Sequence, residues 1–297
     1  MSVRFLKQKC TSAEFKIELS DTEQVTLPPY RYSMNQRAEI RRQINEMIEI
    51  GVVEPSVSEY SSPVVLVKKQ DGSWRMCVDL RQVNKKIKGD SYPLPHIKDC
   101  LHALNGAKWF ICIDLNSGYW QFPIRKEDQH ILAFITSDGL YHFTCMPFGI
   151  KTAPAFCQRA IDVVFSGLKW KCVICYQDDL IFFAPTFELL LERFRLGLQR
   201  LKEHNLTIKP SKCVFGVRSV KFLGHIVDNE GIKMDPEKIE ALKMFPMPTC
   251  VRDIQVLMGF LGFYRPFYEN LSVEGERLFR LLRKDVKFEM GDAERET

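Results

Sequence analysis

The chain has 297 residues, of which 45% are hydrophobic and 27% are charged, and its formal net charge is +5. Such a chain can bury a large core, and no low-complexity tract points to disorder. The charge is compatible with nucleic acid but does not require it. No apolar run approaches the roughly 20 residues that span a membrane as a helix, so we expect no membrane partner.

The ten cysteines lack the spacing of a disulfide framework, and no signal peptide is recognisable. We interpret them as reduced thiols of an intracellular protein. Cys172 and Cys175 form a C-x-x-C, but residues three apart on a strand point to opposite faces. Because no second Cys/His pair accompanies them, the spacing does not favour zinc.

Short helices and strands are expected from about residue 33, after twenty weakly ordered residues. Ser33 and Gln36 predict a capping box, Ile40, Ile44, Met47 and Ile48 form the stripe of that helix, and Gly51 ends it. The elements expected next, in chain order, are strands at 62–69 and 74–80 joined by a hairpin turn, a helix at 96–106, a strand at 108–115, strands at 131–136 and 140–145 around a second hairpin turn, a helix at 154–167, strands at 171–176 and 180–184, and a helix at 186–205.

Two of these helices have predicted apolar faces. The residues of these faces are Phe156, Ala160, Val163 and Val164 in the first helix and Leu190, Phe194, Leu198 and Leu201 in the second. After Gly231 only helices are expected, at 249–264 and 272–284, preceded by one that Asp235 caps with Pro236 at its first position.

Basic residues gather in two stretches. One contains Lys68, Lys69, Arg75, Arg81, Lys85, Lys86 and Lys88, and the other Arg200, Lys202, Lys209, Lys212, Arg218 and Lys221. Such stretches suit a phosphate track, because each neutralised phosphate releases counterions. Taken alone, either stretch is more typical of a solvated face.

Carboxylates stand where apolar strands end. Asp178 and Asp179 separate the apolar runs Cys172–Tyr176 and Leu180–Phe183, and Asp114 ends the run that begins at Trp109. Adjacent carboxylates at the tip of a buried hairpin repel one another and need a cation. If the strands are neighbours, Asp114 and Asp178 converge and can bridge two Mg²⁺ ions about 3.5–4 Å apart. An Asp-Asp pair in a turn is also ordinary turn chemistry.

Several short motifs now combine into a resemblance. They are Trp74-Arg75-Met76-Cys77-Val78-Asp79-Leu80-Arg81, Ile113-Asp114-Leu115-Asn116-Ser117-Gly118-Tyr119, Met146-Pro147-Phe148-Gly149, Tyr176-Gln177-Asp178-Asp179 and Phe222-Leu223-Gly224-His225. Occurring in this order, they resemble the reverse transcriptases of gypsy-type LTR retrotransposons, relatives of the retroviral enzymes. The resemblance extends from about Pro29 to about Phe288.

The resemblance implies an α+β right-hand polymerase fold. The expected segments are an N-terminal extension at 1–24, fingers at 25–88 and 122–152, a palm at 89–121 and 153–229, a helical thumb at 230–285, and a truncated connection from 286 to 297. The family continues into connection and RNase H domains, so we expect a polymerase-only piece without RNase H, protease or integrase, whose parent polyprotein carries the RNase H and connection domains.

Residue roles follow from the same resemblance. Asp114, Asp178 and Asp179, with the Leu115 carbonyl, would hold two Mg²⁺ ions, for which Mn²⁺ can substitute. The dNTP-binding residues would be Lys68, Arg75, Tyr119, Phe148 and Gly149, with Tyr119 excluding a 2′-hydroxyl. Primer and template would contact Tyr176, Gln177, Phe222, Leu223, Gly224, Arg81 and Asn84. Lys212 is a candidate general acid, although a solvated lysine is the more ordinary interpretation.

The implied function is an RNA- and DNA-templated DNA polymerase that extends a primer 3′-hydroxyl with dNTPs and releases pyrophosphate. Its partners would be an RNA template, a DNA template–primer duplex and dNTPs, and the resemblance also admits a homodimer. Its implied location is cytoplasmic, in virus-like particles, or nuclear. Two alternatives remain open: a domesticated, catalytically silent nucleic-acid-binding relic, and an RNA-templated RNA polymerase, which Tyr119 disfavours. Departures from the family pattern occur at Gln177, Trp120 and Phe122.

Overall fold

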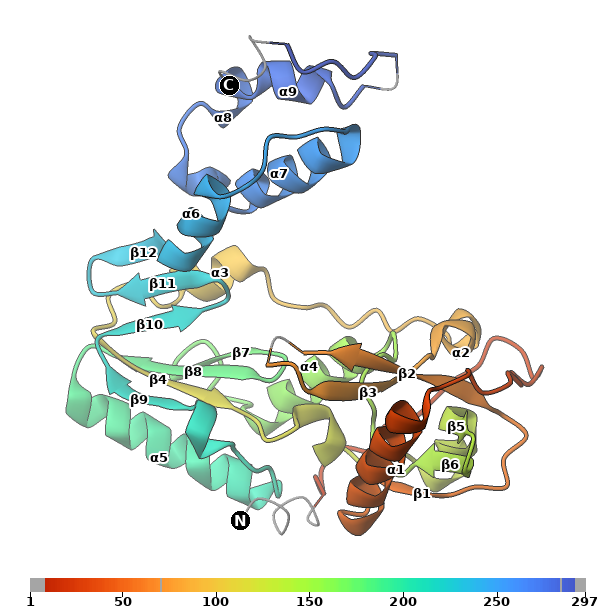
Figure 1. Ribbon diagram of the computed structural model, residues 1–297. Coiled ribbons are helices and arrows are strands. Elements are labelled where there is room, and N and C mark those ends of the chain that lie inside the picture. Colours follow the sequence, from red (N-terminus) through yellow and green to blue (C-terminus); the bar gives the residue numbers. More distant parts are fainter. Residues whose placement is uncertain (1–8, 70, 284, 292–297) are drawn as a thin grey trace. The chain divides into compact units, whose positions relative to one another are not determined.

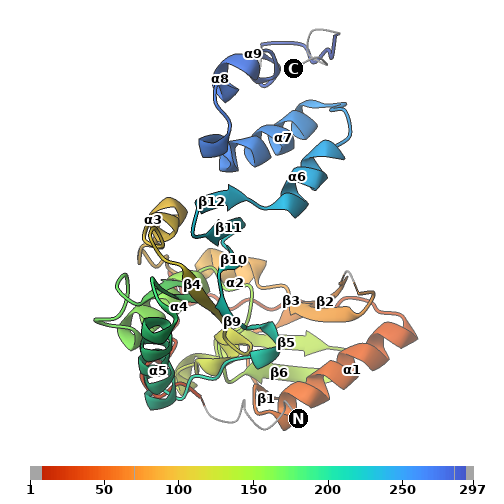
Figure 2. The same ribbon diagram turned by 90° about the vertical axis from the view of Figure 1, so that its left-hand side faces the viewer.

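The structure, a computed structural model, describes residues 9–69, 71–283 and 285–291 (Figures 1 and 2). The chain divides into two compact units, residues 1–218 and residues 219–297. The first unit contains two sheets with their helices, and the second contains a small sheet followed by helices. The predicted limits of fingers, palm and thumb stay a prediction.

A mixed sheet of order β1-β6-β5-β2-β3 forms one half of the first unit. Its strands are β1 (Val53–Pro55), β2 (Ser62–Lys68), β3 (Trp74–Val78), β5 (Ala133–Thr136) and β6 (Gly139–Phe143). Strands β2 and β3 form the predicted antiparallel hairpin, in which Lys68 faces Trp74. The second predicted hairpin joins β5 to β6, and the β2–β5 pairing is parallel.

Helix α1 (Met34–Glu49) packs beside this sheet, as its sequence predicts (Figure 1). The Ser33 hydroxyl accepts from the backbone N–H of Gln36, and the Gln36 side chain accepts from the backbone N–H of Ser33. Ile40, Ile44 and Met47 are buried, whereas Ile48 is exposed at the edge of the stripe. The capping box and the apolar face thus set the start and the orientation of the helix.

The second sheet of this unit has the order β7-β8-β4-β9. Its strands are β4 (Trp109–Asp114), β7 (Val173–Tyr176), β8 (Asp179–Ala184) and β9 (Val214–Val217), and they pair antiparallel throughout. Helix α4 (Ala153–Val164) contacts β7, and helix α5 (Phe187–Glu203) runs along β8 and β4 (Figure 1). The central strand β8 is therefore buried from Leu180 to Ala184.

The predicted apolar faces of α4 and α5 are partly wrong. Val163 and Leu198 are 57% and 39% exposed, whereas Ala160, Val164, Leu190 and Leu201 are buried. Both helices carry apolar residues on more than one side, so sequence periodicity alone does not choose the packed face. In α5 that face includes Gly197, where an added Cβ would lie 2.2 Å from the ring of Phe182.

Among the described residues of the N-terminal segment, 9–20 pack against the first unit, which corrects the expectation of weak order for these residues. The rest of that prediction lies outside the described residues. Phe15 is 1% exposed, its N–H donates to the Pro123 carbonyl at 2.8 Å and its carbonyl accepts from Arg125. The N–H of Ile17 donates to the Asp128 carboxylate at 2.9 Å. Extended backbone in this segment thus pairs with a distant part of the chain, a contact that no local pattern reveals.

Short elements complete the first unit. They are α2 (Arg81–Lys86), α3 (Ile97–His102), and 3₁₀ turns at Gly118–Gln121, Lys126–Leu132 and Pro210–Lys212. Helix α3 confirms the short helix predicted at 96–106, whereas α2 and β1 were not predicted from the sequence.

The second unit begins with strands β10 (Ser219–Phe222), β11 (His225–Asp228) and β12 (Gly231–Met234), which pair antiparallel in that order. Strand β12 corrects the expectation of helices alone after Gly231. The expected cap is confirmed at α6 (Pro236–Lys243), where the Asp235 side chain accepts from the N–H of Glu237. Helix α7 (Val251–Phe263) follows as predicted.

The last predicted helix is divided in two. Helix α8 (Leu271–Glu274) and helix α9 (Glu276–Arg280) meet at Gly275, where an added Cβ would lie 2.8 Å from the Leu271 carbonyl oxygen. The predicted end at Lys284 lies outside the described residues. Of the expected connection, Val286, Phe288 and Met290 pack against the core of these helices, and 292–297 also lie outside the described residues.

No helix among the described residues is long and apolar enough to cross a membrane. All ten cysteines fall within the described part, and each has a free thiol. Cys175 is buried, and Cys172 is half-buried. The interpretation of the cysteines as thiols is therefore consistent with the fold.

Candidate active site

The β4–β8 pairing brings two of the predicted aspartates opposite one another. Its register is continuous from Trp109 facing Ala184 to Asp114 facing Asp179. The strands that end in carboxylates are therefore neighbours, as the sequence predicts. Opposite residues of an antiparallel pair have Cβ atoms about 4.5–5.5 Å apart, so the two side chains project from the same face.

Asp178 occupies the turn between β7 and β8. The preceding residue, Gln177, has a left-handed backbone with φ of 55°. On the other side of the turn, an added Cβ at Gly118 would lie 3.1 Å from the Cβ of Asp178. The glycine of the Asp114–Tyr119 motif thus allows its backbone to approach Asp178 closely, a role that a larger residue could not fill without displacing the turn.

The electrostatics of this site favour a cation. Partial burial of the carboxyl group, followed by the nearby Asp178 and Asp114, raises the pKa of Asp179 to about 6. The positive charge of Lys212 lowers the pKa of Asp179 and so opposes this rise. The Lys212 ammonium lies within the carboxylate group, with Nζ 3.2 Å from Oδ2 of Asp114. The backbone N–H of Lys209 donates to the Asp114 carbonyl at 2.9 Å, so the segment before β9 wraps the end of β4.

Within the described residues, no three histidine, cysteine, aspartate or glutamate side chains form a group that could hold a metal ion by itself. This does not conflict with a magnesium site, because Mg²⁺ takes one or two carboxylates and completes its shell with waters and substrate phosphates. The hard oxygen donors at Asp114, Asp178 and Asp179 fit such an ion. Leu115, whose carbonyl is a predicted ligand, is buried and forms a bridge to Ile208.

Tyr119 and Phe148 form an aromatic surface beside the turn. Their ring centroids are 5.2 Å apart, and Phe148 is 56% exposed. The Tyr119 hydroxyl donates to the Gln177 side-chain oxygen at 3.4 Å. Burial, with Cys157 and Asp178 nearby, raises the pKa of Tyr119 to about 12, so its hydroxyl stays protonated at neutral pH. Trp120, one of the family departures, lies 6.2 Å from Phe148 between ring centroids.

The Phe148 loop is held by a residue that was predicted to contact primer or template. The Asn84 side chain donates to the Gly149 carbonyl at 2.7 Å and accepts from the Lys151 N–H at 2.9 Å. Gly149 itself has φ of 93°, a conformation that favours glycine. In this structure Asn84 therefore positions the loop that carries Phe148.

The β2–β3 hairpin presents free positive charge. Arg75 and Lys69 are exposed, and within the described part of the chain neither forms an ion pair. Lys68 lies over the Trp74 ring, with Nζ 5.3 Å from the centroid. Elsewhere in the same basic stretch, carboxylates neutralise Arg81, Lys86 and Lys88 through Asp79, Asp21, Glu23 and Glu18. Within this stretch, the exposed residues without an ion pair in the described part are thus Lys68, Lys69 and Arg75 of the hairpin, and Lys85.

The second basic stretch is also partly neutralised. Lys221 pairs with Asp235 at 2.6 Å and with Glu237 at 2.8 Å, and Lys212 pairs with Asp114. The Arg218 guanidinium lies 4.5 Å from the centre of the Trp109 ring. Lys209 remains exposed and forms no ion pair in the described residues. The stretch is therefore less free for phosphate than its composition suggests.

The predicted primer-positioning residues form the β10–β11 turn of the second unit. Leu223 and Gly224 both have left-handed backbones, with φ of 45° and 77°. The Tyr264 hydroxyl donates to the Gly224 carbonyl at 2.8 Å, and an added Cβ at Gly224 would meet the Phe263 ring at 3.4 Å. Phe222 is buried. Helix α7 therefore fixes the shape of this turn.

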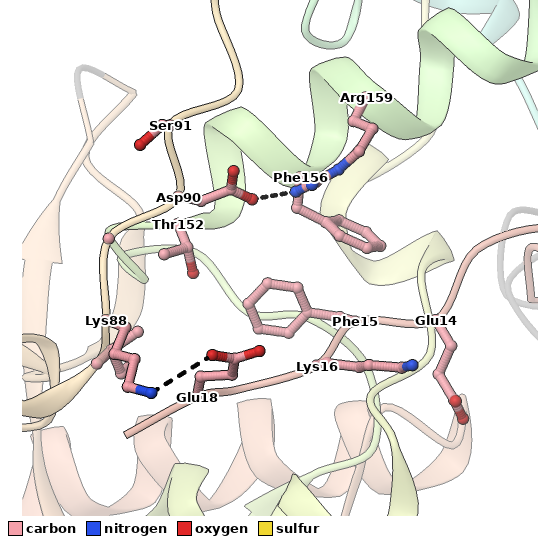
Figure 3. A pocket seen from close by; sticks show the side chains of 12 residues that line it. Glu14, Phe15, Lys16, Glu18, Lys88, Asp90, Ser91, Thr152, Phe156 and Arg159 are labelled. Carbon is pink, nitrogen blue, oxygen red and sulfur yellow. Dashed lines mark hydrogen bonds and ion pairs between the residues drawn. The ribbon is translucent and has the colours of Figure 1, made fainter. Parts of the chain in front are cut away.

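A cavity of about 450 Å³ lies at the N-terminal segment and the start of α4, and its lining contains none of the predicted site residues (Figure 3). Its charged groups are largely paired. Arg159 contacts Asp90, and Lys88 lies 3.7 Å from Glu18. We assign no part of the polymerase site to it.

Sequence reasoning missed two polar residues of α4 that lie behind the catalytic turn. Gln158 is fully buried, and its side chain contacts the turn. Asp162, one helical turn later, accepts from Gln158 at 2.8 Å. A polar pair four residues apart, in a helix whose one other polar residue is Arg159, was the available signal.

The register of β4 and β8, the turn between β7 and β8 and the basic hairpin together describe a nucleotidyl-transfer site. Residues 67–227 match the reverse transcriptase (RNA-dependent DNA polymerase) family, and the chain belongs to this family. The family predicted from the motifs is thereby confirmed.

Curated relatives identify the group within the family. They include the retrovirus-related Pol polyproteins from the Drosophila melanogaster transposons 412 and opus, at 36% and 34% identity over 283 and 278 residues. The transposon Tf2-3 polyprotein of Schizosaccharomyces pombe is 32% identical over 277 residues. These matches cover 93%, 92% and 93% of this chain but only 23%, 28% and 21% of the relatives.

Solved structures show the fold. The foamy viral protease–reverse transcriptase in complex with an RNA/DNA hybrid matches with a TM-score of 0.82 at 24% identity, over 94% of this chain and 38% of that chain. The dRH form in complex with double-stranded DNA matches with a TM-score of 0.89 at 23% identity, over 97% and 51%. These matches confirm the predicted α+β right-hand polymerase fold.

Proposed function

We propose that this chain extends a primer 3′-hydroxyl with deoxynucleotides on an RNA or DNA template and releases pyrophosphate. The observation that carries the proposal is the placement of Asp114 opposite Asp179, with Asp178 in the adjoining turn. Carboxylates brought together in this way repel one another until cations neutralise them. The foamy viral relatives, with RNA/DNA hybrid and double-stranded DNA bound, support the choice of template and primer.

Asp114, Asp178 and Asp179 would hold two Mg²⁺ ions, with Mn²⁺ as a substitute. When bound, such ions lower the pKa of an attacking hydroxyl and neutralise charge that develops on the phosphates. Asp114 and Asp179 contribute acceptor-only oxygens from rigid strands, and the turn after β7 contributes Asp178. Lys212 now serves Asp114 as a counter-charge. Its predicted role as general acid stays a prediction.

The incoming nucleotide would meet the β2–β3 hairpin and the aromatic surface. Arg75 offers a forked set of donors for phosphate oxygens, and Lys68 adds a point charge. Tyr119, supported by Phe148 and Gln177, would exclude a 2′-hydroxyl by bulk. Because Tyr119 leaves little room for a ribose hydroxyl, a deoxynucleotide is the better substrate.

The test is single-nucleotide and full-length primer extension by the purified chain. Matched RNA and DNA templates of one sequence are each supplied with dNTPs or rNTPs, and with Mg²⁺, Mn²⁺ or EDTA. We expect extension on both templates with dNTPs and a divalent ion only. Binding of the template–primer without extension under any condition would favour the silent relic, and a preference for rNTPs would favour an RNA polymerase.

A further inference from the structure

The catalytic turn rests on one fully buried amide side chain. The Oε1 of Gln158 accepts from the backbone N–H of Gln177 at 2.9 Å. Its Nε2 donates to the Cys175 carbonyl at 3.1 Å and to Oδ1 of Asp162 at 2.8 Å. The amide of Gln158 is thus bonded on both sides, and one of its partners is the residue that precedes Asp178.

Asp162 gathers three donors at one carboxylate. Besides Gln158, the Tyr92 hydroxyl donates to Oδ2 at 2.8 Å, and the Lys169 ammonium lies 2.5 Å from the same oxygen. Burial and the bond to Asp162 raise the pKa of Tyr92 to about 12, so this hydroxyl remains a donor. The side chains of Asp162 and Lys169 are only 16% and 18% exposed, which keeps the group together.

Two acceptors, the Asp162 carboxylate and the Cys175 carbonyl, determine which way the Gln158 amide points. An ionised aspartate only accepts hydrogen bonds, so it requires the NH₂ end of the amide to face it. The carbonyl end must then face the N–H of Gln177. If Asp162 lost its acceptor character, the Cys175 carbonyl alone would hold the NH₂ end. The amide could then turn over more easily, and its NH₂ group would oppose the N–H of Gln177.

The bond matters because the turn is strained. Gln177 is not glycine, yet its φ is 55°, a conformation that L-residues adopt at a cost in free energy. Trp170, next to Lys169, has φ of 69°. Strain of this kind persists only where surrounding contacts impose it. At Gln177 the Gln158 amide binds the backbone N–H, while Tyr119 contacts only the side-chain oxygen.

We propose that Asp162, with Lys169 and Tyr92, is a positioning residue that orients the Gln158 amide and thereby holds the Gln177 turn in the conformation that presents Asp178. Its effect on catalysis depends on the proposed polymerase function, but its effect on the turn does not. The two can therefore be tested separately.

The first test is amide hydrogen exchange, which needs no activity. The main variant replaces the ion pair by apolar residues, Asp162→Leu with Lys169→Met, because such swaps of buried pairs often preserve stability. The control is the matched swap Arg125→Met with Asp128→Leu, since Asp128 also pairs with an arginine and accepts a distant N–H. The single variant Asp162→Ala, which also removes the acceptor, is included in case the Asp162→Leu/Lys169→Met variant does not fold.

We expect exchange at the Gln177 amide to become about tenfold faster in both Asp162 variants, because one hydrogen bond is lost there. Gln158→Met should produce the same change, and combining it with Asp162→Ala should add nothing further. The Arg125/Asp128 swap should leave this amide unchanged. Equal protection of the Gln177 amide in the wild type and in the Asp162 variants would overturn the proposal. So would exchange rates that add when Gln158→Met is combined with the Asp162 substitution.

The second test is primer extension over a range of Mg²⁺ concentrations. A misplaced Asp178 should raise the Mg²⁺ concentration for half-maximal rate in the Asp162 variants, whereas the Arg125/Asp128 swap should leave that concentration unchanged. An unchanged Mg²⁺ dependence together with faster exchange at Gln177 would show that a loosened turn still presents Asp178 correctly. This result would overturn the proposed effect of Asp162 on catalysis. Failure of the wild-type chain to extend would contradict the proposed function and leave the exchange result standing.

Discussion

Asp114 and Asp179 occupy directly opposite positions on antiparallel strands β4 and β8. Every intervening residue pair is in register back to Trp109 and Ala184. A slip of one residue would turn both carboxylates to the other face of the sheet. The buried residues of β8 therefore fix the site as well as the fold, because they anchor this register.

This pairing predicts a pH-dependent stability of the metal-free protein. The pKa of Asp179 in the folded chain is about 6, above its ordinary 3.8, so protonation favours the folded state. The contribution of Asp179 to stability should therefore fall as pH rises from about 4 to about 6. Asp179→Asn should then raise the melting temperature in EDTA at pH 7.5. Asp179 is only partly removed from solvent, which still screens its carboxylate, so we expect at most about 1 kcal/mol.

Asp79 provides a control of opposite sign. Its bond to Arg81 lowers the pKa of Asp79 to about 2, so Asp79→Asn should lower the melting temperature at pH 7.5. Thermal unfolding of both variants between pH 4 and pH 8 checks the pair. A destabilising Asp179→Asn at neutral pH, without metal, would mean that the carboxylates do not repel one another in the folded chain.

Sugar selection should depend on the ring of Tyr119. Replacing it by valine should improve incorporation of ribonucleotides relative to deoxynucleotides by about 10- to 100-fold. Tyr119→Phe keeps the ring and loses only the 3.4 Å contact with Gln177, so it should retain discrimination. Single-nucleotide kinetics with paired dNTP and rNTP measure both. If the valine variant discriminated between dNTPs and rNTPs as well as the wild type does, Tyr119 would have a structural role only.

The free charge of the β2–β3 hairpin should act on the incoming nucleotide. Arg75→Met should lower kcat/KM for dNTPs by about 10- to 100-fold, because a charged hydrogen bond contributes about 1.5–3 kcal/mol. Lys85→Met is the control, since Lys85 belongs to the same basic stretch, is exposed, and has no predicted role. If both variants lower kcat/KM by the same factor, the loss reflects the reduced positive charge of the stretch and not a specific contact between Arg75 and a phosphate.

Close packing behind the site predicts an unusual glycine effect. Gly197→Ala should destabilise the chain by about 1–3 kcal/mol despite the better helix propensity of alanine, because its Cβ would overlap the ring of Phe182. Gly259→Ala in α7 meets no atom within 4 Å and should stabilise by up to about 1 kcal/mol. Chemical unfolding of both variants compares them. A stabilising Gly197→Ala would show that Phe182 can move away freely.

Sequence patterns correctly predicted the helix caps and the hairpin, which depend on residues close together in the chain. The Ser33–Gln36 capping box, the hairpin before Trp74 and the Asp235 cap depend on residues close in sequence, and all are present. The strand-ending aspartates were recognisable because a carboxylate at the end of an apolar run is conspicuous. Which aspartates face one another could not be predicted, because Asp114 lies opposite Asp179 only through the tertiary pairing of β4 with β8.

What the sequence could not reveal depends on distant or competing contacts. Phe15 pairs with Pro123 and Arg125, more than a hundred residues away. Val163 is as apolar as its buried neighbours and still faces solvent, since α4 offers more apolar positions than its sheet covers. Gln158 and Asp162 resemble surface residues in the sequence, and only the packing of α4 against β7 brings them behind the turn.

Asp178→Asn probes metal-dependent nucleotidyl transfer at this turn, because it keeps the shape of the turn and removes one anionic ligand. Extension rate and template–primer affinity are measured on the same preparation, with Asp128→Asn as a control for loss of a buried aspartate elsewhere. We expect the rate to fall by about 10³-fold or more, while affinity changes little, since phosphate contacts supply most of it. Extension by Asp178→Asn at a rate near that of the wild type would contradict the account.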